Sequence, residues 1–140
     1  MPRNQKDETP DTDTILKAAG LIASSAAVAT ILDLGTGRVD GRVIVNVTAI
    51  EVATGDERYL IKTQFSAVPA MGSVVFGGTA LDLGDSSVTN SSADSIVGTY
   101  ELPFCNEING TLHRYMRLYT SVQGTIATGI NYSAYAVKKA

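Results

Sequence analysis

The strongest constraint on the fold is an alternation of apolar and polar residues in the middle of the chain. Over residues 42–52, small apolar residues take every second position, and polar Asn46 and Thr48 fall between them. A repeat of two places successive side chains on opposite faces of an extended chain, which indicates a half-buried β-strand. Its apolar face consists of Val43, Val45, Val47 and Ala49.

Residues 58–68 repeat this pattern, with Tyr59, Ile61, Thr63 and Phe65 on one face. Pro69 closes the segment, because proline has no N–H to donate to a sheet. Between the two alternating segments lies Thr54-Gly55-Asp56, a combination typical of a turn. The sequence therefore predicts that residues 42–52 and 58–68 pair as a β-hairpin.

Short segments of strand character recur along the rest of the chain, separated by turn residues. Pro103 closes one of them, residues 85–94 form a polar run that predicts a surface loop, and Asn109-Gly110 predicts a tight turn. The other expected strands cover residues 30–34, 73–76, 79–83, 95–102, 113–122 and 126–137. This spacing predicts an all-β fold, a β-sandwich or barrel of about eight strands.

The first part of the chain has a different composition. Residues 1–14 are charged and contain Pro2 and Pro10, which predicts an extended N-terminal arm. Residues 15–29 are rich in alanine, and this composition allows a short helix over Ile15 to Ile22. We therefore divide the chain into an arm and linker, residues 1–29, and a β-sandwich domain, residues 30–140.

Charge and hydropathy argue against two classes of partner. The formal net charge is −3 and the isoelectric point is about 5.0, so no broad basic surface is expected to attract nucleic acid. The uncharged stretch 18–32 is short for a transmembrane helix and follows an acidic segment instead of a basic one. The sequence thus predicts neither a nucleic-acid partner nor a membrane partner.

The chain has little of the side-chain chemistry that enzymes use. Cys105 and His113 are the single cysteine and the single histidine, too few for a zinc site and without an evident third group for a dyad. We predict no enzymatic activity and no catalytic, cofactor-binding or metal-binding residues. Asp82, Asp85 and Asp94 flank the polar loop, where they are either solvated acids or oxygen ligands for calcium.

Two motifs in the last third of the chain, and one near its start, resemble a known family. They are Arg114-Tyr115-Met116-Arg117-Leu118-Tyr119-Thr120, Gly124-Thr125-Ile126-Ala127-Thr128-Gly129, and Ile31-Leu32-Asp33-Leu34-Gly35. In this order they resemble the capsid cement (decoration) proteins of tailed bacteriophages. The resemblance implies a jelly-roll-like β-sandwich that forms a homotrimer on the outer surface of the virion capsid, where it stabilises contacts between major capsid protein subunits. A charged N-terminal arm is not expected in that family.

The candidate interface residues come from two places. Tyr115, Arg117 and Tyr119 share one face of an expected strand, and tyrosine and arginine are enriched at protein interfaces. Alternatively, the tyrosines lie in the core with Arg117 at an edge. The expected arm adds Arg3, Lys6, Asp7, Asp11 and Asp13. Two other functions stay open, a carbohydrate-binding β-sandwich on the virion surface and another structural component of the head or tail.

Overall fold

The computed structural model describes residues 15–138, and every regular element within them is a β-strand. Six strands are long: β5 (Asp40–Ile50), β6 (Arg58–Ser66), β7 (Val75–Gly84), β8 (Gly98–Cys105), β11 (Tyr115–Gln123) and β12 (Ile130–Lys138). Six are short: β1 (Ile15–Lys17), β2 (Leu21–Ile22), β3 (Ala26–Ala27), β4 (Leu32–Asp33), β9 (Glu107–Ile108) and β10 (Thr111–Leu112). The prediction of an all-β fold is confirmed.

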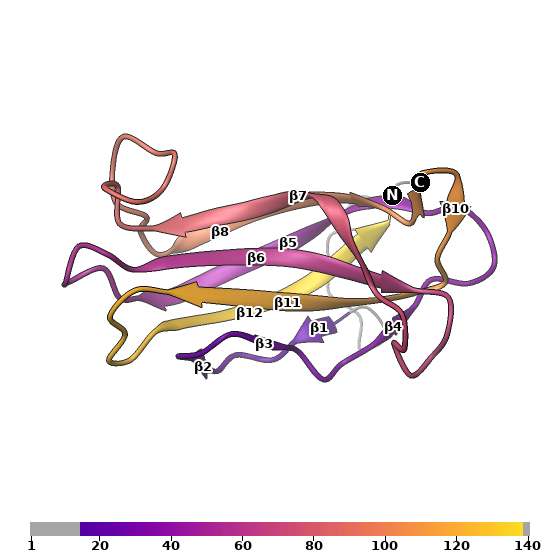
Figure 1. Cartoon of the computed structure of the whole chain (residues 1–140), viewed down its shortest axis with the longest axis horizontal. Coiled ribbons are helices and arrows are strands. Elements are labelled where there is room, and N and C mark those ends of the chain that lie inside the picture. The colour runs from indigo at the N-terminus through magenta and orange to yellow at the C-terminus, as the bar shows by residue number, and fades with distance from the viewer. Residues whose placement is uncertain (1–14, 139–140) are drawn as a thin grey trace, which may run out of the picture.

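The strands form two antiparallel five-stranded sheets that pack face to face. Sheet A has the order β1-β12-β5-β8, with β2 also paired to β12. Sheet B has the order β3-β11-β6-β7, with β4 also paired to β11. In Figure 1, β6 and β11 of sheet B lie in front of β5 and β12 of sheet A. The molecule is therefore a sandwich, in which each sheet has one inner and one outer face.

The core between the sheets follows the alternation in the sequence. Val43, Val45 and Val47 of β5 are buried, while Asn46 between them and Thr48 after them are exposed. The predicted half-buried strand is thus confirmed, but Ala49, expected on the buried face, is exposed, because the register between β5 and β12 shifts between Val47 and Ala49. The largest fully buried side chains come from both sheets and include Tyr59, Ile61, Phe65, Leu102, Met116, Leu118, Ile130 and Tyr132.

The predicted hairpin between residues 42–52 and 58–68 is wrong. The strand β5 pairs with β12 and β8 in sheet A, whereas β6 pairs with β11 and β7 in sheet B. Both strands are apolar on one face only, and the loop between them carries the chain across the core. Their apolar faces therefore meet each other between the sheets instead of lying side by side in one sheet.

The allowed helix over Ile15 to Ile22 is also wrong. The strands β1 and β2 occupy this segment and pair with β12, and β3 pairs with β11 in the other sheet. Edge positions beside β11 and β12 offer this alanine-rich segment backbone partners, which outweigh its weak helix propensity. The described part of the sandwich thus begins at Ile15 instead of the expected boundary at residue 30, and the expected arm lies outside the described residues.

Two turn predictions have different outcomes. Asn109 and Gly110 both have positive φ, 53° and 81°, and join β9 to β10 as a two-residue hairpin turn, as expected. Pro103, by contrast, lies inside β8, opposite Arg42 of β5, and does not end the strand. The strand β8 is the edge of sheet A, where a residue without an N–H is tolerated.

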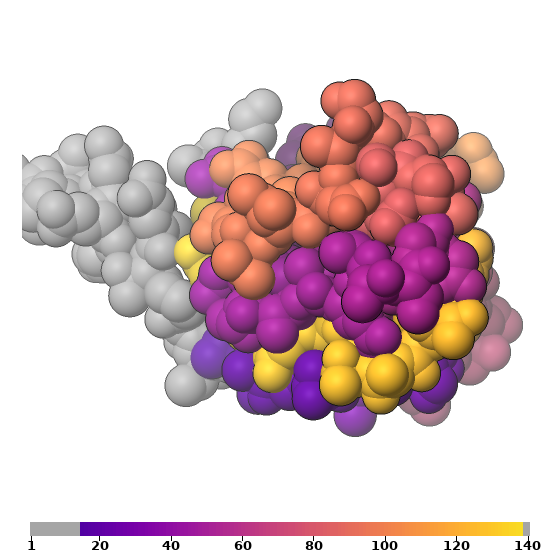
Figure 2. Space-filling model, turned by 90° about the vertical axis from the view of Figure 1, so that its left-hand side faces the viewer, coloured from indigo at the N-terminus to yellow at the C-terminus, as the bar shows by residue number. Residues whose placement is uncertain are grey.

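Carboxylates fix the loops at one end of the sandwich. Figure 2 faces this end, with loop 85–97 in salmon above loop 51–57 in magenta and loop 124–129 in yellow. Glu57 is fully buried and accepts hydrogen bonds of 2.9 to 3.2 Å from the N–H groups of Thr54, Gly55 and Asp56. Glu51 accepts hydrogen bonds from the N–H groups of residues 127–129. The side chains of Glu51 and Glu57 thus accept hydrogen bonds from the loop N–H groups, which would otherwise lack partners within the protein.

Candidate functional site

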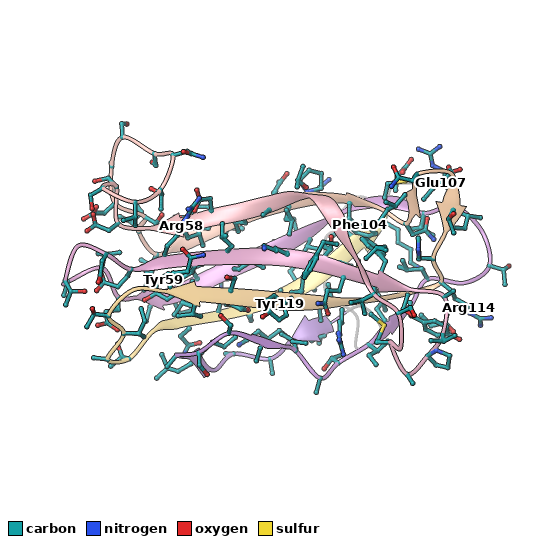
Figure 3. All side chains as sticks on the ribbon, viewed as in Figure 1. Arg58, Tyr59, Phe104, Glu107, Arg114 and Tyr119 are labelled. Atoms are coloured by element: carbon teal, nitrogen blue, oxygen red, sulfur yellow. The ribbon has the colours of Figure 1, made fainter. Side chains whose placement is uncertain are left out.

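The three sandwich residues expected at an interface lie together on the outer face of sheet B. Tyr115, Arg117 and Tyr119 of β11 are half-buried, while the residues between them, such as Met116 and Leu118, are fully buried. Figure 3 shows Tyr119 near the middle of β11. The strand β11 lies between β6 on one side and β3 and β4 on the other. The alternative that places these tyrosines in the core and Arg117 at a sheet edge is therefore wrong.

A bulge in the neighbouring strand β7 adds a large exposed ring to this face. Lys62 of β6 lies opposite Ala80, but Gln64 lies opposite Phe76, so residues 77–79 of β7 face Thr63 alone. A Cβ atom on Gly77 would overlap the Thr63 hydroxyl and touch the Phe65 ring. Glycine therefore permits the bulge, and the register shift sets Phe76 opposite Gln64, beside Lys62 and Arg117, instead of opposite Ser66.

The exposed ring of Phe76 gathers a lysine and a tyrosine around it. Its side chain is 46% exposed. The ammonium nitrogen of Lys62 lies 5.1 Å from the centre of the Phe76 ring, within cation–π distance. The ring of Tyr119 meets Phe76 edge to face, with centroids 5.8 Å apart and an interplanar angle of 73°. We call Lys62, Gln64, Phe76, Arg117 and Tyr119 the aromatic–cationic face.

Arg117 differs from the other arginines of the described residues in its partner. Its Nε donates a 2.7 Å hydrogen bond to the amide oxygen Oε1 of Gln64, which is uncharged. Each of the others forms an ion pair with a carboxylate, namely Arg38, Arg42, Arg58 and Arg114. Lys62 forms no ion pair with the described residues either. The aromatic–cationic face therefore carries two positive charges that no described carboxylate neutralises.

Tyr115 belongs to a neutral neighbourhood at the start of β11. The guanidinium of Arg114 lies 5.5 Å from the Tyr115 ring centre and donates two hydrogen bonds to Asp33, of 2.8 and 3.0 Å. These bonds to Arg114, with one from the N–H of Gly35, lower the pKa of Asp33 to about 2. Because Asp33 neutralises Arg114, this end of β11 contributes no excess charge.

Sequence reasoning found part of this surface. The alternation in residues 113–122 identified Tyr115, Arg117 and Tyr119, and the same rule in residues 58–68 could have placed Lys62 on the outer face. Phe76 was missed, because the sequence predicts separate strands over residues 73–76 and 79–83 and does not show which residue of β6 the bulge sets opposite Phe76. The other expected interface residues, Arg3, Lys6, Asp7, Asp11 and Asp13, lie outside the described residues.

The cysteine and the histidine have separate surroundings. Cys105 is half-buried at the end of β8, near the guanidinium of Arg38. His113 is buried just before β11, with Nδ1 3.4 Å from the backbone oxygen of Asn106. The side chain of Asn106, fully buried, donates to the carbonyls of Gly37 and His113 and accepts from the N–H of Val39. These contacts hold the loops beside β8 and β11.

The acids around the polar loop are hydrogen-bonded within the protein. Asp82 forms two hydrogen bonds with Arg58, of 2.9 and 3.0 Å. Asp85 accepts from the N–H and the hydroxyl of Ser87, and Asp94 accepts from the N–H of Ser86. Among residues 15–138, no three or more Asp, Glu, His or Cys side chains cluster as metal ligands would. The calcium reading of this loop thus has no geometric support in the described residues.

Comparisons with known protein families and with curated proteins find no match to this chain. Within the described residues, no helix of sufficient length and apolarity to cross a membrane is found.

Proposed function

We propose that this protein is a capsid cement protein of a tailed bacteriophage, which binds the outer surface of the head and stabilises contacts between major capsid protein subunits. In this proposal the sandwich has jelly-roll-like connectivity and assembles as a homotrimer. The aromatic–cationic face is the observation that carries the proposal. It is a surface suited to the contacts between protein chains that a homotrimer on a capsid needs, since aromatic residues and arginine are enriched where interfaces are buried.

This function needs binding surfaces and no reacting group. A protein that binds the assembled shell, and not its free subunits, stabilises the shell by mass action. A trimer presents three linked contacts, so individually weak contacts sum to tight attachment. The motif that resembles the cement family, residues 114–120, also contains two members of the aromatic–cationic face, Arg117 and Tyr119.

The experiment measures the mass of the purified protein and its binding to heads that lack it. Analytical ultracentrifugation is expected to give about three times the 14.7 kDa mass of the chain. Added protein is expected to sediment with the heads, to appear at three-fold positions by cryo-electron microscopy, and to raise the temperature at which the heads disassemble. A monomer that does not bind heads would contradict the proposal.

A carbohydrate-binding protein is the second candidate, and the exposed Phe76 ring beside Tyr119 favours it, since sugars stack on such rings. A glycan array separates the two candidates. Glycan binding that is lost in Phe76→Ala, in a protein that does not bind heads, would favour the carbohydrate reading.

A further inference from the structure

Every carboxylate of the described residues has a hydrogen-bond or ion-pair partner within the fold. None of them pairs with the two cations of the aromatic–cationic face, Lys62 and Arg117. The chain has 14 acidic residues, of which ten lie within residues 15–138. Each of the ten has a hydrogen-bond or ion-pair partner in the fold: Asp33, Asp40, Glu51, Asp56, Glu57, Asp82, Asp85, Asp94, Glu101 and Glu107. A carboxylate that pairs with Lys62 or Arg117 would therefore come from outside residues 15–138.

The remaining four acidic residues lie together in one short segment. Residues 7–13 read Asp-Glu-Thr-Pro-Asp-Thr-Asp, with four carboxylates and no cation. In extended form these seven residues span about 23 Å. Neighbouring strands are about 4.8 Å apart, so the segment is long enough to cross the aromatic–cationic face from β7 to β11. Its charge is opposite to that of the face, and charge complementarity of this kind selects partners and orients them.

The position of the first strand indicates which copy of the chain supplies this segment. The strand β1 begins at Ile15 and lies at the edge of sheet A. The aromatic–cationic face lies on the outer side of sheet B, which points away from sheet A. A segment that enters the fold at sheet A has to turn around the edge of its own sheet B to reach that outer face, whereas it meets the outer face of a neighbouring molecule without such a turn.

We propose that the acidic segment Asp7–Asp13 of one copy binds the aromatic–cationic face of a second copy, with its carboxylates on Lys62 and Arg117. The contact joins two different surfaces, so repeating it around a rotation axis closes a ring. That the ring closes with three copies rests on the homotrimer of the proposed function. The contact itself requires only a second copy.

Zero-length cross-linking of the full-length protein tests this contact directly. A water-soluble carbodiimide joins the amine of Lys62 to a carboxylate only where the two groups touch. The protein is prepared as an equal mixture of ¹⁴N-labelled and ¹⁵N-labelled chains, and linked peptides are identified by mass spectrometry. We expect mixed-label peptides that join Lys62 to residues 7–13. Links found only within one label, or no link at Lys62, would overturn the proposal.

Two variants control for chance reactivity at an exposed lysine. Lys62→Arg keeps the charge but removes the amine, so the link is expected to disappear while the mass of the assembly stays unchanged. Lys138 at the end of β12 is an internal reference, since it is exposed and lies outside the aromatic–cationic face. Links from residues 7–13 to Lys138 as frequent as those to Lys62 would contradict a specific contact.

Charge reversal gives a second, independent readout. Arg117→Glu is expected to abolish the interchain link and lower the mass of the assembly in sedimentation. Arg42→Glu is the matched control, because Arg42 lies on the outer face of sheet A, and it is expected to leave both unchanged. An unchanged link and mass in Arg117→Glu would overturn the proposal. All these measurements are made without heads, so a trimer that binds heads but shows no interchain link overturns this contact alone and leaves the proposed function standing.

Discussion

The hydroxyl groups of Tyr132 and Thr120 lie 2.7 Å apart in the middle of the sandwich and join sheet A to sheet B. Both side chains are fully buried, Tyr132 on β12 and Thr120 on β11. Burial raises the pKa of Tyr132 to about 12, so the phenol keeps its proton well into the alkaline range. Each hydroxyl therefore satisfies the hydrogen-bonding capacity of the other between the two sheets.

Removing one hydroxyl of this pair is expected to destabilise the fold. Tyr132→Phe leaves the Thr120 hydroxyl buried without a partner and should lower the free energy of unfolding by about 1–2 kcal/mol. Adding Thr120→Val removes the stranded group and should recover part of the loss. Urea unfolding of the wild type, both single variants and the double variant measures this coupling. Independent, additive effects would contradict the pairing.

The two adjacent glycines of β7 provide a matched test of the bulge. A Cβ atom on Gly77 would overlap Thr63, whereas a Cβ atom on Gly78 meets nothing within 4 Å. Gly77→Ala is therefore expected to destabilise the protein by about 1–3 kcal/mol, and Gly78→Ala to change stability little. Thermal unfolding of the two variants tests this expectation. Equal decreases in the unfolding temperature of Gly77→Ala and Gly78→Ala would show that the bulge does not have this geometry.

Lys17 is a buried cation surrounded by carbonyl groups. Its ammonium donates to the backbone oxygens of Ala18, Gly20 and Tyr132, at 3.0, 3.0 and 2.7 Å, and burial lowers its pKa. Lys17→Met should leave these acceptors without a donor and lower the free energy of unfolding by about 1–3 kcal/mol. Lys138→Met, at an exposed position, is the control and should have little effect.

Acid is expected to weaken the loop end of the sandwich. Hydrogen bonds from the N–H groups of Gly129 and Thr128 lower the pKa of Glu51, and those from the N–H and hydroxyl of Thr125 and the hydroxyl of Thr54 lower that of Asp56. For Glu57, burial raises the pKa, but hydrogen bonds from the turn outweigh it and the net shift is downward.

The unfolded chain binds protons on these acids before the folded protein does, so their stabilising effect is present above the ordinary pKa values of 3.8 and 4.5 and is lost as the pH falls below them. We expect the urea concentration at the unfolding midpoint, measured from pH 7 to pH 2, to decrease once the pH is below about 4.5. In Glu51→Gln the fall should be shallower. A midpoint that is independent of pH in this range would rule out these hydrogen bonds as a source of stability.

Local sequence patterns predicted the strands better than their partners. The alternation in residues 42–52 correctly assigned Val43, Val45 and Val47 to the buried face of β5, because side-chain direction along a regular strand depends only on position, and it failed at Ala49, beyond the register shift. The same alternation in residues 58–68 led to a hairpin that does not exist. An amphipathic strand can bury its apolar face whether its neighbour in the sequence pairs with it in one sheet or packs against it from the opposite sheet. The loop between β5 and β6 decides which arrangement occurs. Glu57 holds this loop only because it is buried there, which no local pattern shows.

For the aromatic–cationic face too, some features follow from the sequence and others only from the tertiary structure. The sequence by itself determined that Tyr115, Arg117 and Tyr119 share one face of a strand, because a period of two is a property of the extended backbone. Only the tertiary structure decided that this face points outward, that the bulge at Gly77 brings Phe76 beside Tyr119, and that Arg117 alone among the described arginines lacks a carboxylate. Register and pairing depend on contacts between segments far apart in the chain, and no local pattern encodes them.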